Sequence, residues 1–442
     1  MLANKEIKST YYQVFLESFV DSNSDGIGDI RGFRGKLSII GQLGVNYCLL
    51  NQVFDTDGDK VNYKKIKASL GDENSIKLLC QKAKEFRMKI ILDFDFKDLY
   101  NNFAEEKLVD EFLEILKFWK EEGITGFRVN NLDLLFEKYK DESEQILKKI
   151  KEKASELELI FIGGLSDQNL IKNADLLDMV YLGKANSLIK EKNSYKEFYE
   201  FIDSLQEKND IHYGIDFNNI SSPRLIDKVL DDEEESKAFV TGLAILLLTL
   251  DTIPFIYQGE EIEAKSEYNV HMDRVNDEAI TKAYDNFIKD GLSEEEALKE
   301  IKRTSNFSSK IPIRWEDSTL GGFSEVKNYY GSMVNLDNNF KKYLKDGKSF
   351  FFVLHEAIML RKRISAFGLG EYEKLSLDDS AYIYKKTFKD ESYVILVNLS
   401  DDFYEVDEKI AEEIADGQII LNNNRDFEAE VLDAYQSVII KL

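Results

Sequence analysis

Short apolar runs alternate with amphipathic helical stretches along the first 260 residues of the chain. Eight of these runs have the length and composition of buried β-strands, at residues 11–16, 45–50, 89–94, 126–129, 159–163, 179–183, 212–216 and 252–257. Between them, the stretch from Val109 to Trp119 places its apolar residues on one helical face. Strands that alternate with helices favour a parallel sheet, and eight strands close a (β/α)8 barrel. We therefore expect an α/β protein with a TIM barrel.

The pattern changes towards the C-terminus. Residues 346–364 predict a long helix, and after Phe367 the apolar positions recur with a period of two. The alternating runs lie at residues 382–384, 393–398 and 437–442. Short alternating strands between turn residues are typical of a small β-sandwich. The sequence thus predicts a barrel domain over residues 1–365 and a C-terminal all-β sandwich domain over residues 366–442.

The composition narrows the possible partners. The 442 residues carry 83 acidic and 58 basic side chains, for a formal net charge of −25, which repels nucleic acid and anionic membrane surfaces. Two cysteines and three histidines are too few for a disulfide framework or a histidine-rich zinc site. The sequence shows neither a signal-peptide pattern at its N-terminus nor an apolar run of membrane-spanning length. We expect a cytoplasmic protein that binds neither nucleic acid nor a membrane.

The sharpest local motif lies between residues 21 and 29. Oxygen-bearing side chains occupy alternate positions there, and glycines allow a tight turn, which suits a hard cation. The expected ligands are the side chains of Asp21, Asn23, Asp25 and Asp29 and the main-chain carbonyl of Ile27. The alternative is a polar turn in which these side chains cap backbone groups. We favour a structural Ca²⁺, with Mg²⁺ as the second choice, because carboxylates this close together repel each other without a cation.

Ten segments, in order along the chain, are similar to the landmarks of one enzyme family. They are residues 11–15, 18–23, 25–32, 42–46, 90–93, 126–129, 254–261, 311–315, 321–323 and 360–363. On these residues the chain resembles the α-amylase family, glycoside hydrolase family thirteen, and within it the oligo-1,6-glucosidases and related α-glucosidases. The resemblance implies a (β/α)8 barrel, a terminal β-domain and cleavage of α-glucosidic bonds with retention.

The motifs that carry the three catalytic carboxylates of that family match this chain at positions held by other residues. The resemblance places the nucleophile directly after the Gly-Phe-Arg-Val run, at Asn130. It places the acid/base glutamate at Gly164 and the third carboxylate at Ser221. An amide, a hydrogen atom and a hydroxyl cannot supply the carboxylate pair that retaining hydrolysis needs. We expect that natural divergence removed all three catalytic groups.

The rest of the family's cleft is matched only in part. Asp59, Arg128 and Arg224 match substrate-contacting positions. Guanidinium and carboxylate groups can hold sugar hydroxyls through two hydrogen bonds each. The alternative for Arg128, which we favour, is a structural pairing with a neighbouring Asp. The roofing domain that the family inserts after its third barrel strand is largely absent, because few residues separate Asp98 from the helix near Val109.

Two functions therefore remain open. The first is a non-catalytic homologue, a pseudoenzyme that binds a small oligosaccharide or a protein partner. The second is an active α-glucosidase or transglycosylase, acting on small α-glucosides with a relocated carboxylate pair. Several aspartates near predicted strand ends could supply that pair: Asp93, Asp95, Asp98, Asp133, Asp167 and Asp216. We favour the first function, because three catalytic groups and the roof are lost together.

Overall fold

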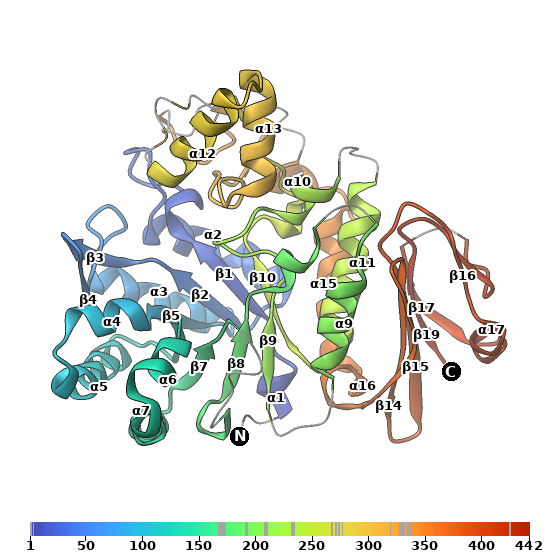
Figure 1. Cartoon of the computed structure of the whole chain (residues 1–442), viewed down its shortest axis with the longest axis horizontal. Coiled ribbons are helices and arrows are strands. Elements are labelled where there is room, and N and C mark those ends of the chain that lie inside the picture. Colours follow the sequence, from blue (N-terminus) through green and yellow to red (C-terminus); the bar gives the residue numbers. More distant parts are fainter. Residues whose placement is uncertain are drawn as a thin grey trace.

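A computed structural model describes residues 2, 4–166, 174–190, 193–206, 211–230, 235–266, 268–269, 272, 275, 277–318, 320–326, 332–333, 338–423 and 426–442. Eight parallel strands form a closed barrel in the order β1-β10-β9-β8-β7-β6-β5-β2. They are β1 (Tyr11–Phe15), β2 (Tyr47–Asn51), β5 (Lys89–Asp95), β6 (Gly126–Asn130), β7 (Ile160–Gly164), β8 (Met179–Leu182), β9 (Tyr213–Ile215) and β10 (Ile253–Tyr257). The predicted TIM barrel and its eight strands are confirmed (Figure 1).

Successive side chains of the barrel strands point in opposite directions and so belong to two separate clusters of buried residues. Tyr11 stacks on Tyr47 and on Phe255, with ring centroids 4.5 Å apart in both pairs, in a cluster separate from the main core. The next residues along β1 and β2, Tyr12 and Cys48, belong to the main core instead. Because side chains alternate with a period of two, polar residues in register with Tyr11 also face the inside of the barrel. The candidate site is built from such residues.

Helices surround the barrel (Figure 1). They are α1 (Asn4–Ile7), α2 (Ile30–Leu43), α3 (Glu73–Glu85), α4 (Phe96–Asn102), α5 (Glu105–Glu121), α6 (Asp133–Tyr139), α7 (Ser143–Glu156), α8 (Ala185–Leu188), α9 (Lys196–Ser204), α10 (Leu225–Val229), α11 (Ser236–Thr249), α12 (Glu278–Lys289), α13 (Glu294–Thr304), α14 (Phe340–Tyr343) and α15 (Phe350–Arg363). α5 contains the predicted apolar face, and the chain turns after it at Gly123, where φ is +102°. A short pair, β11 (Tyr268–Asn269) and β12 (Ser332–Met333), lies beyond the last barrel strand.

The segment after β2 departs from a plain β/α repeat. β3 (Phe54–Asp57) and β4 (Lys60–Ile66) form an antiparallel hairpin that packs against α4 and α5. The side-chain amide of Asn102 hydrogen-bonds to both the N–H and the carbonyl of Val61, and the Trp119 indole donates to the carbonyl of Tyr63 at 2.7 Å. These side chains occupy the outer edge of β4. Between β5 and α5 the only helix is α4, so no roofing domain follows the third barrel strand.

The C-terminal part is an antiparallel domain, as expected. Five strands pair in the order β13-β14-β15-β19-β17, and a two-stranded sheet joins β16 to β18. Their bounds are β13 (Glu371–Leu377), β14 (Ala381–Phe388), β15 (Glu391–Asn398), β16 (Tyr404–Glu405), β17 (Gln418–Asn422), β18 (Val431–Leu432) and β19 (Ser437–Lys441), with α16 (Ala366–Leu369) before them and α17 (Glu408–Ile414) among them. The second layer is thus a two-stranded sheet together with α17, which share a core cluster with one face of the large sheet.

Two buried cations lie near the junction of this domain with the barrel. The guanidinium of Arg361, on α15, is fully buried. It donates to four main-chain carbonyls, those of Ile7, Leu248, Leu250 and Thr252. Lys386 on β14 is also fully buried and pairs with Asp251 at 2.5 Å. Arg361 and its acceptors belong to the barrel domain and close its amino-terminal end, whereas the pair of Lys386 and Asp251 joins the C-terminal sheet to that end of the barrel.

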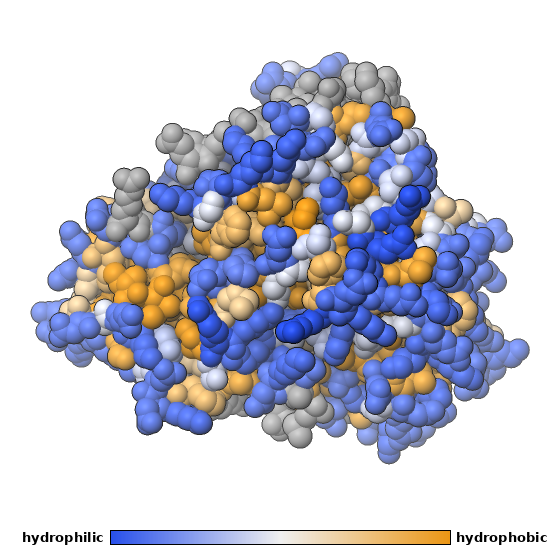
Figure 2. All heavy atoms as spheres, turned by 180° about the vertical axis from the view of Figure 1, so that it is seen from behind, coloured by the Kyte–Doolittle hydropathy of each residue, from blue (hydrophilic) through white to orange (hydrophobic). Residues whose placement is uncertain are grey.

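In the part of the chain that the structure describes, no helix is both long and apolar enough to cross a bilayer. Figure 2 shows hydrophilic residues over most of one face, with hydrophobic patches between them, one of which lies on the side of the C-terminal domain. Two of the large hydrophobic side chains of that domain are well exposed, Phe403 at 66% and Ile419 at 47%.

Candidate functional site

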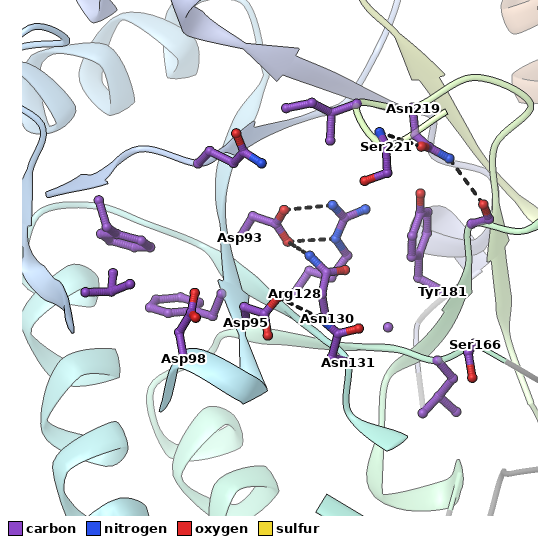
Figure 3. Close-up of a pocket in the computed structure, with 18 of the residues that line it drawn as sticks. Asp93, Asp95, Asp98, Arg128, Asn130, Asn131, Ser166, Tyr181, Asn219 and Ser221 are labelled. Carbon is purple, nitrogen blue, oxygen red and sulfur yellow. Dashed lines mark hydrogen bonds and ion pairs between the residues drawn. The ribbon is translucent and has the colours of Figure 1, made fainter. Parts of the chain in front are cut away.

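A cavity of about 580 Å³ opens at the carboxyl ends of the barrel strands (Figure 3). Its walls come from the ends of β5, β6, β7 and β8, from the loop after β9 and from the β3–β4 hairpin. Asn130, Gly164 and Ser221 line this cavity together. The active sites of (β/α)8 barrels lie at this end of the fold, where loops of variable sequence meet. The cavity is therefore the candidate functional site.

A buried ion pair lies in the cavity wall. Nε and Nη2 of Arg128 donate to the two carboxylate oxygens of Asp93, each at 2.8 Å, and the two side chains are only 4% and 8% exposed. Asp93 also accepts hydrogen bonds from the amides of Asn51, at 2.7 Å, and Asn130, at 2.8 Å. A buried pair of this kind is stable only when further hydrogen bonds satisfy its remaining lone pairs. The geometry agrees with the structural role that we favoured for Arg128.

Gln13 extends the ion pair into a wider network. Its Oε1 accepts from Nη1 of Arg128 at 3.0 Å, and its Nε2 donates to the carboxylate of Asp216 at 2.5 Å. Tyr181 donates its hydroxyl to the same carboxylate, and the guanidinium carbon of Arg128 lies 4.3 Å from its ring centroid. Burial raises the pKa of Asp216, although the hydrogen bonds from Tyr181 and Gln13 oppose the rise. Sequence reasoning missed Gln13, whose signal was a polar residue in the middle of an apolar strand.

Asn130 and Gly164 touch across the two neighbouring strands β6 and β7. A Cβ atom added at Gly164 would lie 2.7 Å from Oδ1 of Asn130 and 3.0 Å from its Cα. The first distance is shorter than any ordinary contact, and the second atom belongs to the backbone, which cannot move aside easily. The present arrangement thus leaves no space for a side chain at residue 164. A carboxylate could enter there only if Asn130 were displaced.

Ser221 belongs to the loop that follows β9. Its main-chain N–H donates to Oδ1 of Asn219 at 2.9 Å. The amide nitrogen of Asn219 donates in turn to Asp216 at 3.1 Å and to the carbonyl of Gly183 at 3.2 Å. These contacts hold the loop against the ends of β8 and β9. The loop therefore presents a hydroxyl to the cavity at residue 221.

The other two expected substrate contacts lie away from the cavity. Asp59 is exposed in the turn of the β3–β4 hairpin and is not among the lining residues. Arg224 is 2% exposed, and its Nε and Nη2 donate to the main-chain carbonyls of Ser308, at 3.1 Å, and Gln258, at 2.9 Å. Of the three predicted contacts, the structure brings only Arg128 to the cavity.

Three further carboxylates line the cavity: Asp95, Asp98 and Asp133. Asp95 accepts from the main-chain N–H of Lys97 at 2.8 Å and from the amide of Asn131 at 2.7 Å. Burial raises the pKa values of Asp95 and Asp98. Both carboxyl groups therefore keep a proton to a higher pH than exposed aspartates do.

The remaining aspartates of the expected set, Asp133, Asp167 and Asp216, differ in their placement. Oδ2 of Asp133 accepts from the main-chain N–H of Ser166 at 2.9 Å, whereas its Oδ1 is buried without a hydrogen-bond partner among the described residues. Asp167 lies outside the described residues. Asp216 is buried beneath Gln13 and Tyr181 and does not line the cavity.

The loop of residues 21–29 forms a compact turn beside α2. Oδ1 of Asp21 accepts from the N–H of Ser24 at 2.7 Å, and its Oδ2 accepts from the N–H of Gly26 at 2.8 Å. Asp29 caps α2 through the N–H of Gly32. In the described part of the chain, no group of three or more His, Cys, Asp or Glu side chains is placed to hold a metal. Each carboxylate oxygen of Asp21 already accepts two hydrogen bonds, from the N–H groups of Asn23 and Ser24 at Oδ1 and from the N–H of Gly26 and the hydroxyl of Ser324 at Oδ2, as in the polar turn; calcium stays a prediction.

The fold and the cavity define a (β/α)8-barrel protein with a cavity at the carboxyl ends of its strands. A family model described as "Alpha amylase, catalytic domain" matches residues 13–97 and 95–370. The chain therefore belongs to the α-amylase family, as its motifs indicated.

Two similar proteins bear the names of glucosidases. The chain is 24% identical to a glucan 1,6-alpha-glucosidase of Streptococcus pneumoniae, over 88% of this chain and 90% of that protein. It is 22% identical to a probable oligo-1,6-glucosidase of Bacillus subtilis, over 88% of this chain and 89% of that protein. The first alignment runs over 485 positions, more than the 442 residues of this chain, so that relative carries segments that are missing here.

Solved structures show the same fold. A trehalose-6-phosphate hydrolase of Bacillus licheniformis superposes with a TM-score of 0.87 at 20% identity, covering 98% of this chain and 99% of that chain. An isomaltulose synthase of Erwinia rhapontici superposes with a TM-score of 0.85 at 19% identity, covering 100% and 99%. At this level of identity, the likeness concerns the fold alone.

Proposed function

We propose that this protein is a non-catalytic member of the α-amylase family whose barrel cavity binds a small carbohydrate. Its matched catalytic positions hold Asn130, Gly164 and Ser221, and none of the three can serve as a carboxylate nucleophile or acid. Retaining hydrolysis needs two carboxyl groups about 5–5.5 Å apart on either side of the scissile bond. The cavity keeps the position of the family site while lacking this pair at the matched residues.

The contact between Gly164 and Asn130 carries the proposal. A Cβ atom at residue 164 would approach Oδ1 of Asn130 to 2.7 Å, so even an alanine overlaps the present packing. A side chain at residue 164 therefore requires the amide of Asn130 to move, which supports the view that an acid is absent from this position.

Binding is supported by the shape and chemistry of the cavity. Its volume of about 580 Å³ lies in the range of small-molecule pockets. Apolar groups such as Phe54 and Val61 line one wall, and Asn131, Ser166 and Ser221 add polar groups to the others. Such a mixture suits a sugar, which presents apolar C–H faces and a rim of hydroxyls.

Two measurements test the proposal together. Purified protein is incubated with nitrophenyl α-glucoside, and its thermal unfolding is measured with glucose, maltose, isomaltose, trehalose and sucrose. We expect no release of nitrophenol above the blank and a higher melting temperature with at least one sugar, because a ligand of the native state stabilises it by mass action. Hydrolysis would refute the non-catalytic role. A melting temperature that none of the sugars raises would refute carbohydrate binding and direct attention to a protein partner.

The second candidate is an active glucosidase with a relocated carboxylate pair. Asp95 and Asp98 favour it, because both line the cavity and burial raises the pKa of each. In that case Asp98→Asn would abolish hydrolysis of the nitrophenyl glucoside while leaving thermal stability intact. Hydrolysis that survives in Asp98→Asn and in Asp95→Asn would exclude this pair.

We also propose that the loop of residues 21–29 binds a structural Ca²⁺. Gly26, with φ of +91°, supplies the sharp turn in the sixth position that such loops require. The side-chain oxygens of Asp21, Asn23 and Asp25 lie at alternate positions around it. The ion would neutralise the carboxylates of the loop and brace the first β/α connection.

A further inference from the structure

Gln52 lies just beyond the end of β2, at a point where the chain leaves the barrel. Along β2, Tyr47 and Leu49 belong to the buried cluster inside the barrel, whereas Cys48 and Leu50 belong to the main core around it. Because the side chains of a strand alternate, the next two residues should point inward and outward in turn. Gln52, the second of them, is exposed and nevertheless lines the cavity.

A left-handed bend of the backbone accounts for this orientation. Gln52 has a φ of +55°, in a region that L-residues other than glycine and asparagine rarely adopt. Its neighbours hold the bend, because Asn51 and Val53 are both buried and the carbonyl of Val53 accepts from the N–H of Lys67 at 3.0 Å. Strained backbone persists only where the surrounding structure fixes it. The bend thus turns the chain towards the β3–β4 hairpin and brings the side chain of Gln52 into the cavity wall.

Other left-handed residues have local explanations that Gln52 lacks. Arg87 and Glu158 follow α3 and α7, and helices commonly end in a left-handed residue. Asn131, which also lines the cavity, is of a type that tolerates this conformation, and its amide donates to Asp95 at 2.7 Å. At Gln52 a glycine would make the same bend without strain. A glutamine at this position therefore indicates that its side chain has a use beyond the turn.

The amide of Gln52 indicates what that use is. Its Oε1 can accept hydrogen bonds and its Nε2 can donate them, and neither atom has a partner in the described part of the chain. Two neighbouring hydroxyls of a sugar ring can match this pair, since one donates to the oxygen while the other accepts from the nitrogen. Phe54 and Val61 of the adjoining hairpin give the ring an apolar surface in the same wall.

We propose that Gln52 is a ligand-binding residue of the cavity, whose amide holds two neighbouring hydroxyls of a neutral sugar. This inference rests on the proposed carbohydrate-binding function and names the group that orients the ligand. The strained bend serves to place that amide in the wall, where an extended strand would have turned it away.

Three variants separate the amide from the bend. Gln52→Leu keeps the strained backbone and removes the amide, whereas Gln52→Gly removes both. Arg87→Gly relieves the same kind of strain outside the cavity and is the matched control. Affinities for glucose, maltose, isomaltose, trehalose and sucrose are measured by isothermal titration calorimetry, and stability is measured by thermal unfolding.

We expect the sugar that binds the unaltered protein most tightly to bind about tenfold more weakly to both Gln52 variants, because two hydrogen bonds are lost. Its affinity for Arg87→Gly should not change. The melting temperature should rise by about 1–2 °C in the two glycine variants and should not rise in Gln52→Leu, which keeps the strain.

The monodeoxy derivatives of glucose, each of which lacks one hydroxyl, identify the groups that Gln52 holds. We expect two derivatives that lack neighbouring hydroxyls to bind the unaltered protein more weakly than glucose does. The same two should bind Gln52→Leu as tightly as glucose does, because the amide that held those hydroxyls is gone. Equal losses in the two proteins would place these hydroxyls against other residues and overturn the proposal.

The remaining outcomes separate this inference from the function on which it rests. Unchanged sugar affinity in Gln52→Leu would overturn the role of Gln52 and leave carbohydrate binding in place. A lower melting temperature in Gln52→Gly would overturn the argument from strain. Failure of all five sugars to bind the unaltered protein would overturn both the inference and the proposed function.

Discussion

Replacing Arg128 with methionine tests whether the buried ion pair holds the barrel end together. The guanidinium is 4% exposed and donates twice to Asp93 at 2.8 Å. Methionine keeps an unbranched apolar stem but leaves the Asp93 carboxylate buried without a counter-charge. Breaking one side of a buried pair costs about 3–5 kcal/mol. The amides of Asn51 and Asn130 still donate to Asp93, so we expect a loss near the lower end, about 3 kcal/mol.

The measurement is urea unfolding followed by circular dichroism, with Asp93→Asn and the double variant completing a cycle. If the pair acts as a unit, the double variant loses less free energy of unfolding than the sum of the two single variants. Lys65→Met is the matched control, because Lys65 pairs with Asp55 at 2.7 Å but is 58% exposed. Its loss should be undetectable, as for most surface pairs.

A loss of less than about 1 kcal/mol in the free energy of unfolding for Arg128→Met would contradict the reasoning, since a buried carboxylate without a counter-charge destabilises a protein by more than that. Additive single losses would contradict it as well. In either case the Arg128–Asp93 contact would not stabilise the barrel end, and Arg128 would be better explained as a ligand-binding residue.

Three further predictions concern other parts of the molecule. Gly164→Ala should lower the free energy of unfolding by about 1–3 kcal/mol, because its Cβ would crowd Asn130. Adding Asn130→Gly removes the crowded Oδ1 but also the hydrogen bond to Asp93, so the two losses in urea unfolding should be less than additive; a neutral Gly164→Ala would contradict the packing argument. Burial raises the pKa of Glu260, which follows β10, to about 8 from 4.5. The folded protein therefore binds this proton more tightly than the unfolded chain does, and the free energy of unfolding falls as the pH rises from about 4.5 through 8. Glu260→Gln should flatten that part of the stability curve, and a parallel curve would refute the burial effect. Ca²⁺ should raise the melting temperature, chelator should reverse the rise, and Asp21→Ala should abolish it; a rise that persists in Asp21→Ala would place the ion elsewhere.

The barrel strands could be predicted because they are buried on both faces. Parallel strands of this kind appear as short continuous apolar runs, and all eight were found with ends that differ from the structure by about two residues or fewer. The β3–β4 hairpin could not be found in this way. Its strands are largely polar and exposed, and the Asp57-Gly58-Asp59 turn between them resembled a sugar-binding motif.

The site was only half predictable for a related reason. Motif matching located Arg128, Asn130 and Gly164 because each lies at or near the end of a regular strand, where the register fixes which residues face the cavity. Asp59 lies in a hairpin turn, where register gives no such guide. Arg224 precedes a short helix and donates to main-chain carbonyls of distant loops, contacts that no local pattern encodes.

The identities of residues 93, 130 and 164 depend on one another through direct contacts at the cavity, which the separate motifs do not reveal. Asn130 donates a hydrogen bond to Asp93, and an aspartate at residue 130 would place a second acceptor, with a like charge, against that carboxylate. The Oδ1 of Asn130 in turn fills the space that a side chain at residue 164 would need. Restoring either carboxylate alone therefore disturbs the other position. Asn130→Asp with Gly164→Glu should give an unstable protein before it gives an active one, and a stable, hydrolytic double variant would overturn this coupling.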